Sequence, residues 1–247
     1  MPSARISVQF CCLLLLGIST SFQSFGQSAM HMLMLNDLGA WKAPHGTWHI
    51  VGNTTLDPAD DTKLIGKHGG GVVLNGPTGR TENLISKTEH GDIEVHIEFM
   101  VPKGSNSGVY LQGRYEIQVL DSWGVKTLAH SDCGGIYQRY HEGPEFQGEE
   151  RGYEGRPPRE NASKKPGQWQ SFDITFQAPR FDDQGNKTQN AKFLKVLHNG
   201  ILIHENEELT GPTRAAKWQD EKPRGPLMLQ GDHGPVAYRN IRIKPLD

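Results

Sequence analysis

The clearest pattern in the sequence is the alternation of apolar and polar residues over 92–101. Apolar residues occupy every second position, and Glu94, His96 and Glu98 lie between them. Side chains of a β-strand point alternately to its two faces, so this period predicts a strand with one face in the core. The opposite face is expected to be hydrated or functional.

Shorter runs predict further strands, and no stretch keeps a helical period beyond about three turns. The 29 glycines and 15 prolines of the 247 residues indicate many turns, which also favours an all-β fold. About a dozen strands in one chain predict a large antiparallel sandwich of two sheets. The further strands are expected at 48–51, 71–74, 83–86, 107–112, 115–120, 134–137, 170–176, 193–197, 201–204, 226–230 and 238–243.

The segments between these runs support antiparallel pairing. Asn199-Gly200 separates two apolar runs and is the strongest short-range signal of a β-hairpin, and a second tight turn is expected at Gly113-Arg114. Residues 138–168 are rich in Arg, Glu, Gly and Pro and too long for an ordinary connection, so they predict a long surface loop or lid. Residues 179–191 predict a second polar loop.

Residues 1–26 have the pattern of a secretory signal peptide. Arg5 is their only charge, and the apolar run at 8–18 is shorter than the about 20 residues that a membrane span needs. We expect cleavage before Gln27, with cleavage after Ala29 as the alternative. The mature chain, 27–247, is then a single domain exported to the periplasm or the medium, without a membrane span.

The expected state of each cysteine follows from this interpretation of the leader. Cys11 and Cys12 lie inside the predicted leader and lack the residues that precede a lipidated cysteine, so we expect both to be removed. Cys133 then remains as the only thiol, and no disulfide can form within the chain. We expect it to be buried as a small apolar side chain.

Charge and absent motifs exclude several classes of function. The formal net charge is −2 at pH 7, with basic and acidic residues interspersed, so we expect no nucleic-acid partner. The chain lacks Gly-x-Ser-x-Gly, His-Glu-x-x-His, a phosphate-binding loop and paired Cys-x-x-Cys motifs. Any chemistry must therefore come from carboxylates, histidines and aromatic residues.

The segment 104–123 is the densest in polar residues and predicts a hairpin with an alternating second strand. Glu116 and Gln118 share one face of that strand, while the apolar residues between them take the other. Tyr110 and Gln112 are expected to lie beside this polar face across the hairpin. The arrangement predicts either a binding groove or a solvated polar strand face.

The spacing Glu-x-Gln-x-x-Asp from Glu116 to Asp121 resembles the carboxylate strand Glu-x-Asp-x-x-Glu of retaining β-glucanases. A β-bulge near the end of the strand would turn Asp121 to the same face as Glu116. Gln118, however, stands where those enzymes have an acid, and Asp replaces the terminal Glu. An ordinary displacement reaction with two carboxylates is therefore disfavoured. A glucanase-like glycosidase accordingly ranks third among the interpretations of this sequence.

Five blocks extend the comparison to the whole mature chain. They are Gly-Ser-Asn-Ser-Gly-Val-Tyr-Leu-Gln-Gly-Arg-Tyr-Glu-Ile-Gln-Val-Leu-Asp-Ser at 104–122, Cys-Gly-Gly-Ile-Tyr at 133–137, Trp-Gln-Ser-Phe-Asp-Ile-Thr-Phe-Gln-Ala-Pro-Arg-Phe-Asp at 169–182, Leu-His-Asn-Gly at 197–200 and Asp-His-Gly-Pro-Val-Ala-Tyr-Arg-Asn-Ile at 232–241. In this order they resemble the 3-keto-disaccharide hydrolase family. The resemblance implies a concanavalin A-like jelly roll of the lectin and glucanase type that cleaves 3-keto-glycosides, by hydrolysis or by elimination and hydration.

That chemistry needs a base, an acid and a group that stabilises an enolate. A ketone at C3 acidifies the C2 proton, and its removal expels the oxygen substituent at C1. We expect His96 or His233 to act as the base, and Glu116 or Asp121 to assist at the leaving oxygen. Glu98 is a further candidate that would line the groove.

Aromatic, amide and guanidinium groups suit the binding of the sugar. Tyr110 and Trp123 offer faces for stacking on a pyranose ring, and Arg139 can polarise a carbonyl oxygen. The amides of Asn106, Gln112 and Gln118 complete the predicted binding set. We assign Trp41, Trp48 and Trp169 to the core, and Arg239 and Asn240 to the attachment of the last strand.

The sequence implies no cofactor. His96 with Glu94 and Glu98, or Asp232 with His233, offers metal-binding atoms, but neither set has a diagnostic spacing, so we expect a metal-free site and leave a divalent ion open. A small carbohydrate is the expected partner, and the sequence defines no oligomeric state. The main alternative to an enzyme is a lectin-like module without catalysis, which the surplus of titratable groups disfavours.

Overall fold

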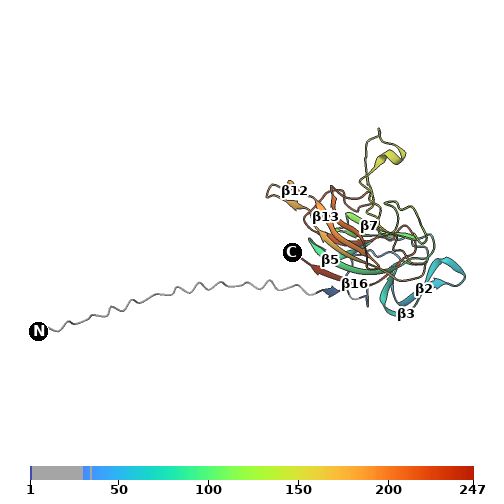
Figure 1. The fold of residues 1–247 in the computed structure, drawn as a ribbon. Coiled ribbons are helices and arrows are strands. Elements are labelled where there is room, and N and C mark those ends of the chain that lie inside the picture. Colours follow the sequence, from blue (N-terminus) through green and yellow to red (C-terminus); the bar gives the residue numbers. More distant parts are fainter. Residues whose placement is uncertain (2–29, 34) are drawn as a thin grey trace.

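The computed structural model describes residues 1, 30–33 and 35–247 and is built almost entirely of antiparallel strands (Figure 1). The predicted leader and its two cysteines lie outside the described residues. Among the residues described, no helix is long and apolar enough to cross a membrane.

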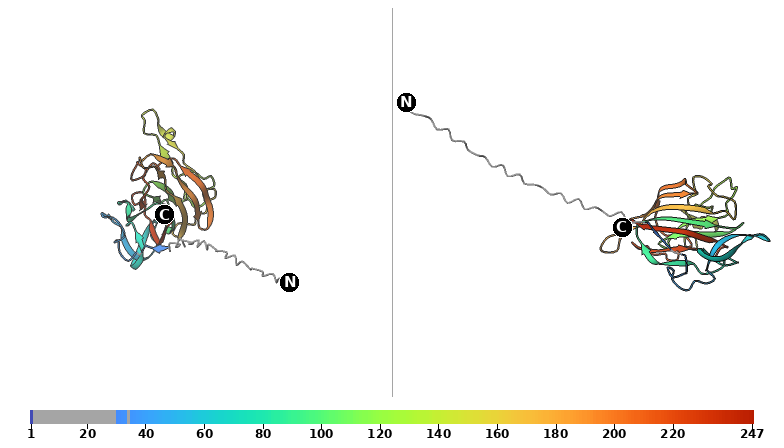
Figure 2. Two further views of the ribbon diagram at one scale, coloured as in Figure 1. Left: turned by 90° about the vertical axis from the view of Figure 1, so that its left-hand side faces the viewer. Right: turned by 90° about the horizontal axis from the view of Figure 1, so that it is seen from below.

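The larger sheet has eight strands. Their order is β14-β13-β10-β5-β16-β3-β2, and β1 pairs with β16. These strands lie side by side when the molecule is seen from below (Figure 2). Their bounds are β1 His31–Met32, β2 His49–Asp57, β3 Asp60–Leu74, β5 Ile93–Met100, β10 Gln170–Gln177, β13 Ala191–His198, β14 Ile201–Leu209 and β16 Ala237–Pro245.

The second sheet has four strands in the order β4-β15-β6-β7. They are β4 Leu84–His90, β15 Gly225–Leu229, β6 Asn106–Leu111 and β7 Tyr115–Leu120. Together the two sheets form the expected jelly-roll sandwich, so the fold prediction is confirmed. Two small ribbons complete the structure: β8 Arg139–Tyr140 with β9 Gly152–Tyr153, and β11 Arg180–Phe181 with β12 Lys187–Gln189.

The core lies between the two sheets, and alternate residues of the central strands supply it. On β5 the residues Ile93, Val95, Ile97 and Phe99 are at most 2% exposed, as the alternation predicts. Phe99 packs on Phe172 of β10 with ring centroids 4.7 Å apart. Burial of one such side chain contributes about 1.5–3 kcal/mol, so this layer supplies much of the driving force for folding.

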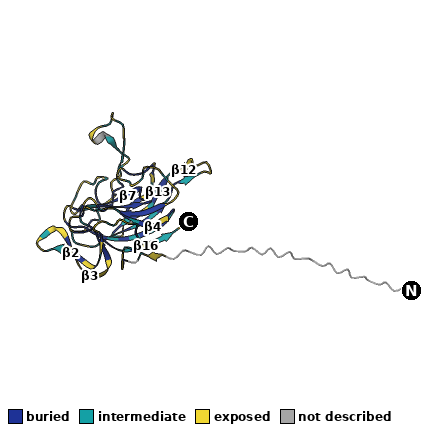
Figure 3. Cartoon of the chain, turned by 180° about the vertical axis from the view of Figure 1, so that it is seen from behind, coloured by how far each residue is buried: buried dark blue, intermediate teal, exposed yellow. Residues whose placement is uncertain are grey.

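Several predicted elements are confirmed and others differ. The hairpin at Asn199-Gly200 joins β13 to β14 with positive φ at both residues. The expected strand at 134–137 makes only isolated bridges at Ile136. β2 and β3 are far longer than expected, because their polar middle sections pair with each other as an exposed hairpin (Figure 3).

Residues 138–168 form the expected long excursion. It contains the ribbon β8-β9 and one short 3-10 helix, η1 Gly148–Arg151, and part of it stands clear of both sheets (Figures 1 and 2). His141 is stacked between Phe146 and Tyr153, with centroids 4.1 Å apart on both sides. We call this excursion, residues 138–168, the arm. Its stacked rings stabilise its local structure, although the arm adds little to the main core.

The three tryptophans that we assigned to the core differ in their burial. Trp41 and Trp48 are 1% and 4% exposed, as expected. Trp169 is only partly buried and packs on a small second cluster, separate from the main core, that includes Met100 of β5. Its other contacts belong to the outer surface of the large sheet.

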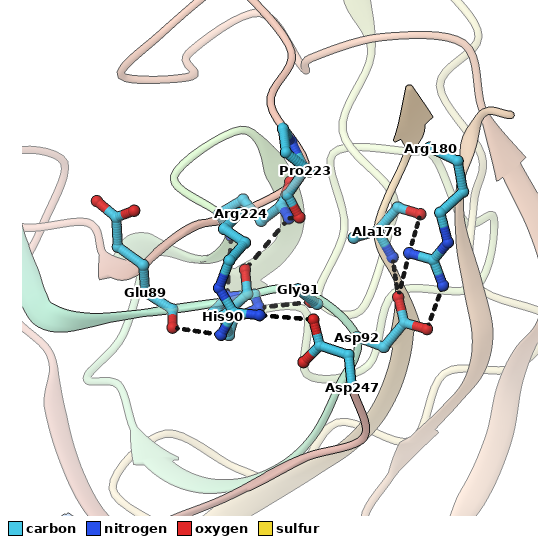
Figure 4. Close-up of polar contacts among 10 residues, drawn as sticks. Glu89, His90, Gly91, Asp92, Ala178, Arg180, Pro223, Arg224 and Asp247 are labelled. Carbon is cyan, nitrogen blue, oxygen red and sulfur yellow. Dashed lines mark hydrogen bonds and ion pairs between the residues drawn. The ribbon is translucent and has the colours of Figure 1, made fainter. Parts of the chain in front are cut away.

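A buried histidine, His90 at the end of β4, lies in a cluster of polar contacts (Figure 4). The imidazole of His90 accepts a hydrogen bond at Nε2 from the backbone of Gln112 (3.1 Å), so its Nδ1 donates to the carbonyl of Gly91 (2.9 Å). Burial lowers the pKa of His90 to about 4. Nearby, the carboxylate of Asp92 accepts from Arg180 and from the backbone of Ala178.

We expect acid to destabilise the fold through His90. The unfolded histidine binds a proton near pH 6.5 and the folded one only near pH 4, so the free energy of unfolding should fall as pH drops between these values, by ~1.4 kcal/mol per unit. Urea denaturation of wild type and His90→Gln at pH 7 and pH 5 measures this. The variant should lose part of the difference, whereas the exposed control His68→Gln should keep all of it. An identical pH dependence in His90→Gln would contradict the assignment.

Candidate active site

A hollow of about 290 Å³ opens on the outer face of the four-stranded sheet. Its floor comes from β6 and β7, and its walls from loops far apart in the sequence. Tyr110 of β6 pairs with Glu116 of β7 in register, which places both side chains on this outer face. The lining residues are Asn106, Glu116, Gln118, Tyr137, Arg214, Ala215, Gln230 and His233.

Glu116 lies at the floor of this hollow and is 2% exposed. Gly108 makes room for it: a Cβ atom at Gly108 would lie 2.4 Å from Glu116 Oε1. The other carboxyl oxygen, Oε2, is buried and has no hydrogen-bond partner among the described residues. A buried polar atom without a partner costs about 1–3 kcal/mol, so the fold maintains this arrangement at the expense of stability.

Burial raises the pKa of Glu116 to about 8; the hydroxyl of Tyr110 opposes this rise, and the charge of Asp232 adds to it. Among the described residues, no cationic side chain contributes to the rise of this pKa. The carboxyl group therefore holds its proton at neutral pH. A protonated acid beside a hollow can donate a proton, as a general acid must.

His233 lines the same hollow from the loop between β15 and β16. Its Nδ1 lies 2.5 Å from the Oδ1 atom of Asp232. The carboxylate accepts the Nδ1 proton, which leaves Nε2 as the basic atom of the neutral ring. Asp232 is itself anchored through its backbone carbonyl, which accepts from the Arg80 guanidinium (2.8 Å).

Arg214 is a wall residue that the sequence analysis missed. Its guanidinium lies over the ring of Tyr140 in the arm, with Cζ 3.9 Å from the centroid, and Arg151 approaches the same ring at 5.5 Å. The backbone of Arg214 donates to the carbonyl of Gln138 (2.9 Å). The long excursion is thus tied to the hollow through this arginine.

No local pattern marked Arg214, Tyr137 or Gln230 as site residues. They come from three connections that the sandwich brings to one face. Tyr137 is the last residue of the Cys-Gly-Gly-Ile-Tyr block, and that block is its only sequence signal. Gln230 directly follows β15 and, like Arg214, lies outside every block.

Asp121 does not join Glu116. The register of β6 with β7 runs without a bulge to the pair of Asn106 and Leu120, so the predicted bulge is wrong. Asp121 instead accepts hydrogen bonds from the backbone of Gly104 and Trp123. It lines a separate hollow of about 460 Å³ together with the exposed Trp123, which therefore also lies apart from Glu116.

Gln112 is a structural residue of the hairpin rather than a neighbour of the polar face. It has φ 54° at the turn, and its side-chain amide donates to the backbone carbonyls of His90 and Pro223. These bonds place Gln112 beside His90, in the polar cluster around that histidine. The turn, with positive φ at both Gln112 and Gly113, aims the side chain away from Glu116.

Arg139 also lies apart from the hollow. Its guanidinium contacts Glu154 and Thr210 and lies over the ring of Tyr153, with Cζ 5.1 Å from the centroid. It therefore helps to hold the β8-β9 ribbon against the loop after β14. Arg214 occupies the position in the hollow that the sequence analysis gave to Arg139.

His96 and Glu98 lie on the other side of the molecule. The apolar residues of β5 face the sandwich core, so its polar residues face outward from the large sheet, whereas Glu116 faces outward from the small one. His96 bonds to Asp173 of β10 through Nδ1 (2.6 Å). The core separates the two groups, so they cannot act on one substrate. Of the two histidines expected as alternative bases, His233 lines the hollow with Glu116 and His96 does not.

Glu94 pairs with Lys244, at 3.1 Å, rather than with His96. Across the residues described, no group of three His, Cys, Asp or Glu side chains forms a metal-binding cluster. Cys133 is buried as expected, 1% exposed, and burial raises the pKa of its thiol to about 12. A thiol in that environment is a packing group and not a nucleophile.

Comparison with known proteins agrees with this architecture. The family model of the 3-keto-alpha-glucoside-1,2-lyase-like domain matches residues 34–244. The chain belongs to this family. The family is carbohydrate-active and glycosyl hydrolase-like, and its match includes every residue that lines the hollow.

Two solved structures of glycosyl hydrolase-like proteins from Parabacteroides distasonis ATCC 8503 resemble this family member. The first has 25% identity and a TM-score of 0.60, covering 87% of this chain and 84% of the other. The second has 21% identity and a TM-score of 0.48, covering 81% of this chain and 99% of the other. No curated protein matches the sequence.

Because its pKa is raised, Glu116 should destabilise the folded state at neutral and alkaline pH. The unfolded carboxyl ionises near pH 4.5 and the folded one only near pH 8, so stability falls by ~1.4 kcal/mol per unit between these values. We expect Glu116→Gln to raise the melting temperature at pH 8 and to change it little at pH 4.5. Differential scanning calorimetry at both pH values measures the gain. Glu160→Gln controls for net charge, and an equal or lower melting temperature at pH 8 would contradict the buried acid.

Proposed function

We propose that the protein cleaves 3-keto-glycosides by elimination across C1 and C2, followed by hydration. The observation that carries this proposal is the buried carboxyl group of Glu116, which keeps its proton at neutral pH and has an unpartnered oxygen at the floor of the hollow. Membership in a lyase-like family on 3-keto sugars supports it. A single protonated acid beside one histidine suits elimination better than displacement by two carboxylates.

In the first step, Nε2 of His233 removes the proton at C2, which the C3 ketone acidifies. The electron pair forms the C1–C2 double bond as the C1–O bond breaks, and Glu116 gives its proton to the departing oxygen. The product is a 2-hydroxy-3-keto-glucal and a free alcohol. Arg214 lines the hollow, and its guanidinium stabilises the negative charge that develops on O3.

Hydration reverses these proton transfers. Glu116, now a carboxylate, takes a proton from water as the oxygen adds to C1, and the imidazolium of His233 returns a proton to C2. The net reaction is hydrolysis, and both groups regain their starting states. The amides of Asn106, Gln118 and Gln230 line the hollow and suit the remaining hydroxyls of the sugar ring.

This mechanism requires the 3-keto group. We expect turnover of a 3-keto-disaccharide and none of the unoxidised parent, measured by mass spectrometry of purified protein with each sugar. Deuterium at C2 should slow a rate-limiting proton removal, and solvent deuterium should appear at C2 of the hydrated product. Equal turnover of both sugars would instead favour a glucanase, and tight binding without turnover would favour a lectin.

The pH profile tests the role of Glu116. The value of kcat/KM should fall above about pH 8, where Glu116 loses the proton it must donate. We expect Glu116→Gln to reduce kcat by about 10²-fold or more and to remove this alkaline fall, and His233→Ala to reduce kcat while keeping it. His96→Ala, on the opposite side of the molecule, should leave the profile unchanged and is the matched control.

Tyr140 should matter to turnover although it does not line the hollow. Loss of its ring removes the stacking partner of Arg214, worth roughly 0.5–2 kcal/mol, so Tyr140→Ala should lower kcat/KM about tenfold. Tyr140→Phe keeps the ring and should stay close to wild type. Steady-state kinetics of the two variants with the 3-keto substrate tests this, and equal losses in both would show that the ring does not position Arg214.

A further inference from the structure

A further hollow, of about 260 Å³, lies on the outer face of the large sheet and belongs to no step of the proposed reaction. The sandwich core separates it from Glu116. Its volume is close to that of the first hollow, enough for about one sugar ring. It is lined by His96, Glu98, Lys164, Trp169, Gln170, Ser171, Asn199 and Arg239.

Arg239 is held in this hollow by two contacts. Its Nε donates to Glu98 Oε2 (2.6 Å), and its guanidinium plane lies over the ring of Trp169, with Cζ 4.0 Å from the centroid. Within the described part of the chain, the two terminal nitrogens make no hydrogen bond. A guanidinium fixed through Nε and through its face presents those two nitrogens as a fork, which matches the two oxygens of a carboxylate.

The charges that line the hollow favour an anion. Lys164 contributes a second cation, and its Nζ is held near Trp169 by a hydrogen bond to the backbone carbonyl of that residue (3.1 Å). Glu98 is the one carboxylate of the lining, and both of its oxygens already accept hydrogen bonds, from Arg239 and Asn240. The lining therefore carries one positive charge in excess when His96 is neutral.

The remaining polar groups suit hydroxyls and are held in place. His96 is fixed at both ring nitrogens: Nδ1 bonds to Asp173 (2.6 Å), and Nε2 accepts from the side-chain amide of Asn240 (3.3 Å). The side chain of Asn199 accepts from the backbone of Ser171 and donates to the carbonyl of Ala162, so the turn after β13 forms a rigid wall. In the described residues the hydroxyl of Ser171 has no hydrogen-bond partner and can bond to a ligand.

We propose that this hollow is a second carbohydrate site that binds an acidic monosaccharide unit, with the sugar carboxylate bound by Arg239 and Lys164. A ring hydroxyl then meets the hydroxyl of Ser171. The site is independent of the Glu116 hollow and of its reaction. It would hold an acidic glycan on one face of the protein while the other face carries the chemistry.

Titration calorimetry of the whole protein with glucuronate and with glucose tests the proposal. We expect glucuronate to bind and glucose to bind far more weakly. Lys164→Ala should weaken glucuronate binding about tenfold, the effect of one charge-assisted hydrogen bond. Arg239→Lys, which keeps the charge but loses the fork, should weaken it at least as much. Lys126→Ala removes an exposed lysine elsewhere and should bind as the wild type does.

Other results would overturn the proposal. Equal binding of glucose and glucuronate would show that the hollow does not recognise the carboxylate. Binding of glucose 6-sulfate without binding of glucuronate would show that the hollow recognises a different anionic group. Glucuronate binding that Glu116→Gln abolishes and Lys164→Ala leaves intact would place the ligand in the other hollow. The absence of glucuronate binding to a wild type that turns over 3-keto sugars would reject this site and leave the proposed function standing. Melting temperatures of all variants check that each is folded.

Discussion

Antiparallel strands that bury one face between two sheets must turn their other face outward, and the hollows at Glu116 and at Arg239 both follow from that constraint. On β5 the apolar residues fill the core, which sends His96 and Glu98 to the outside of the large sheet. On β7 Ile117 fills the same core, which sends Glu116 to the outside of the small sheet. The two polar faces are therefore held in place by the same packed layer, and they point in opposite directions.

The outward position of Glu116 would ordinarily leave it in water. Here the loops that carry Tyr137, Arg214 and His233 cover the small sheet, and the carboxyl group becomes almost fully buried. Its burial without a cationic partner costs stability, and Gly108 is the residue that makes the space for it. Such a cost is typical of functional sites, where a shifted pKa is maintained by the surrounding structure.

The long excursion contributes to the site indirectly. Its rings stack on one another and on arginines, and through Tyr140 it supports Arg214 at the wall of the hollow. A long surface segment therefore has a clear physical role without entering the hollow itself. The other sequence-predicted sugar contacts, Trp123 and Arg139, belong to neighbouring surfaces.

The sequence by itself determined the alternating strands, the hairpin at Asn199-Gly200, the jelly-roll class and the pairing of Glu116 with Tyr110, because each depends on residues close together in the chain or on matching blocks. It did not determine which polar face meets which loop. His96 and Glu116 look equivalent as polar positions on alternating strands, and only the stacking of the two sheets places them on opposite sides of the core. Arg214 and the burial that raises the pKa of Glu116 likewise depend on contacts between distant segments, which the tertiary structure alone decides.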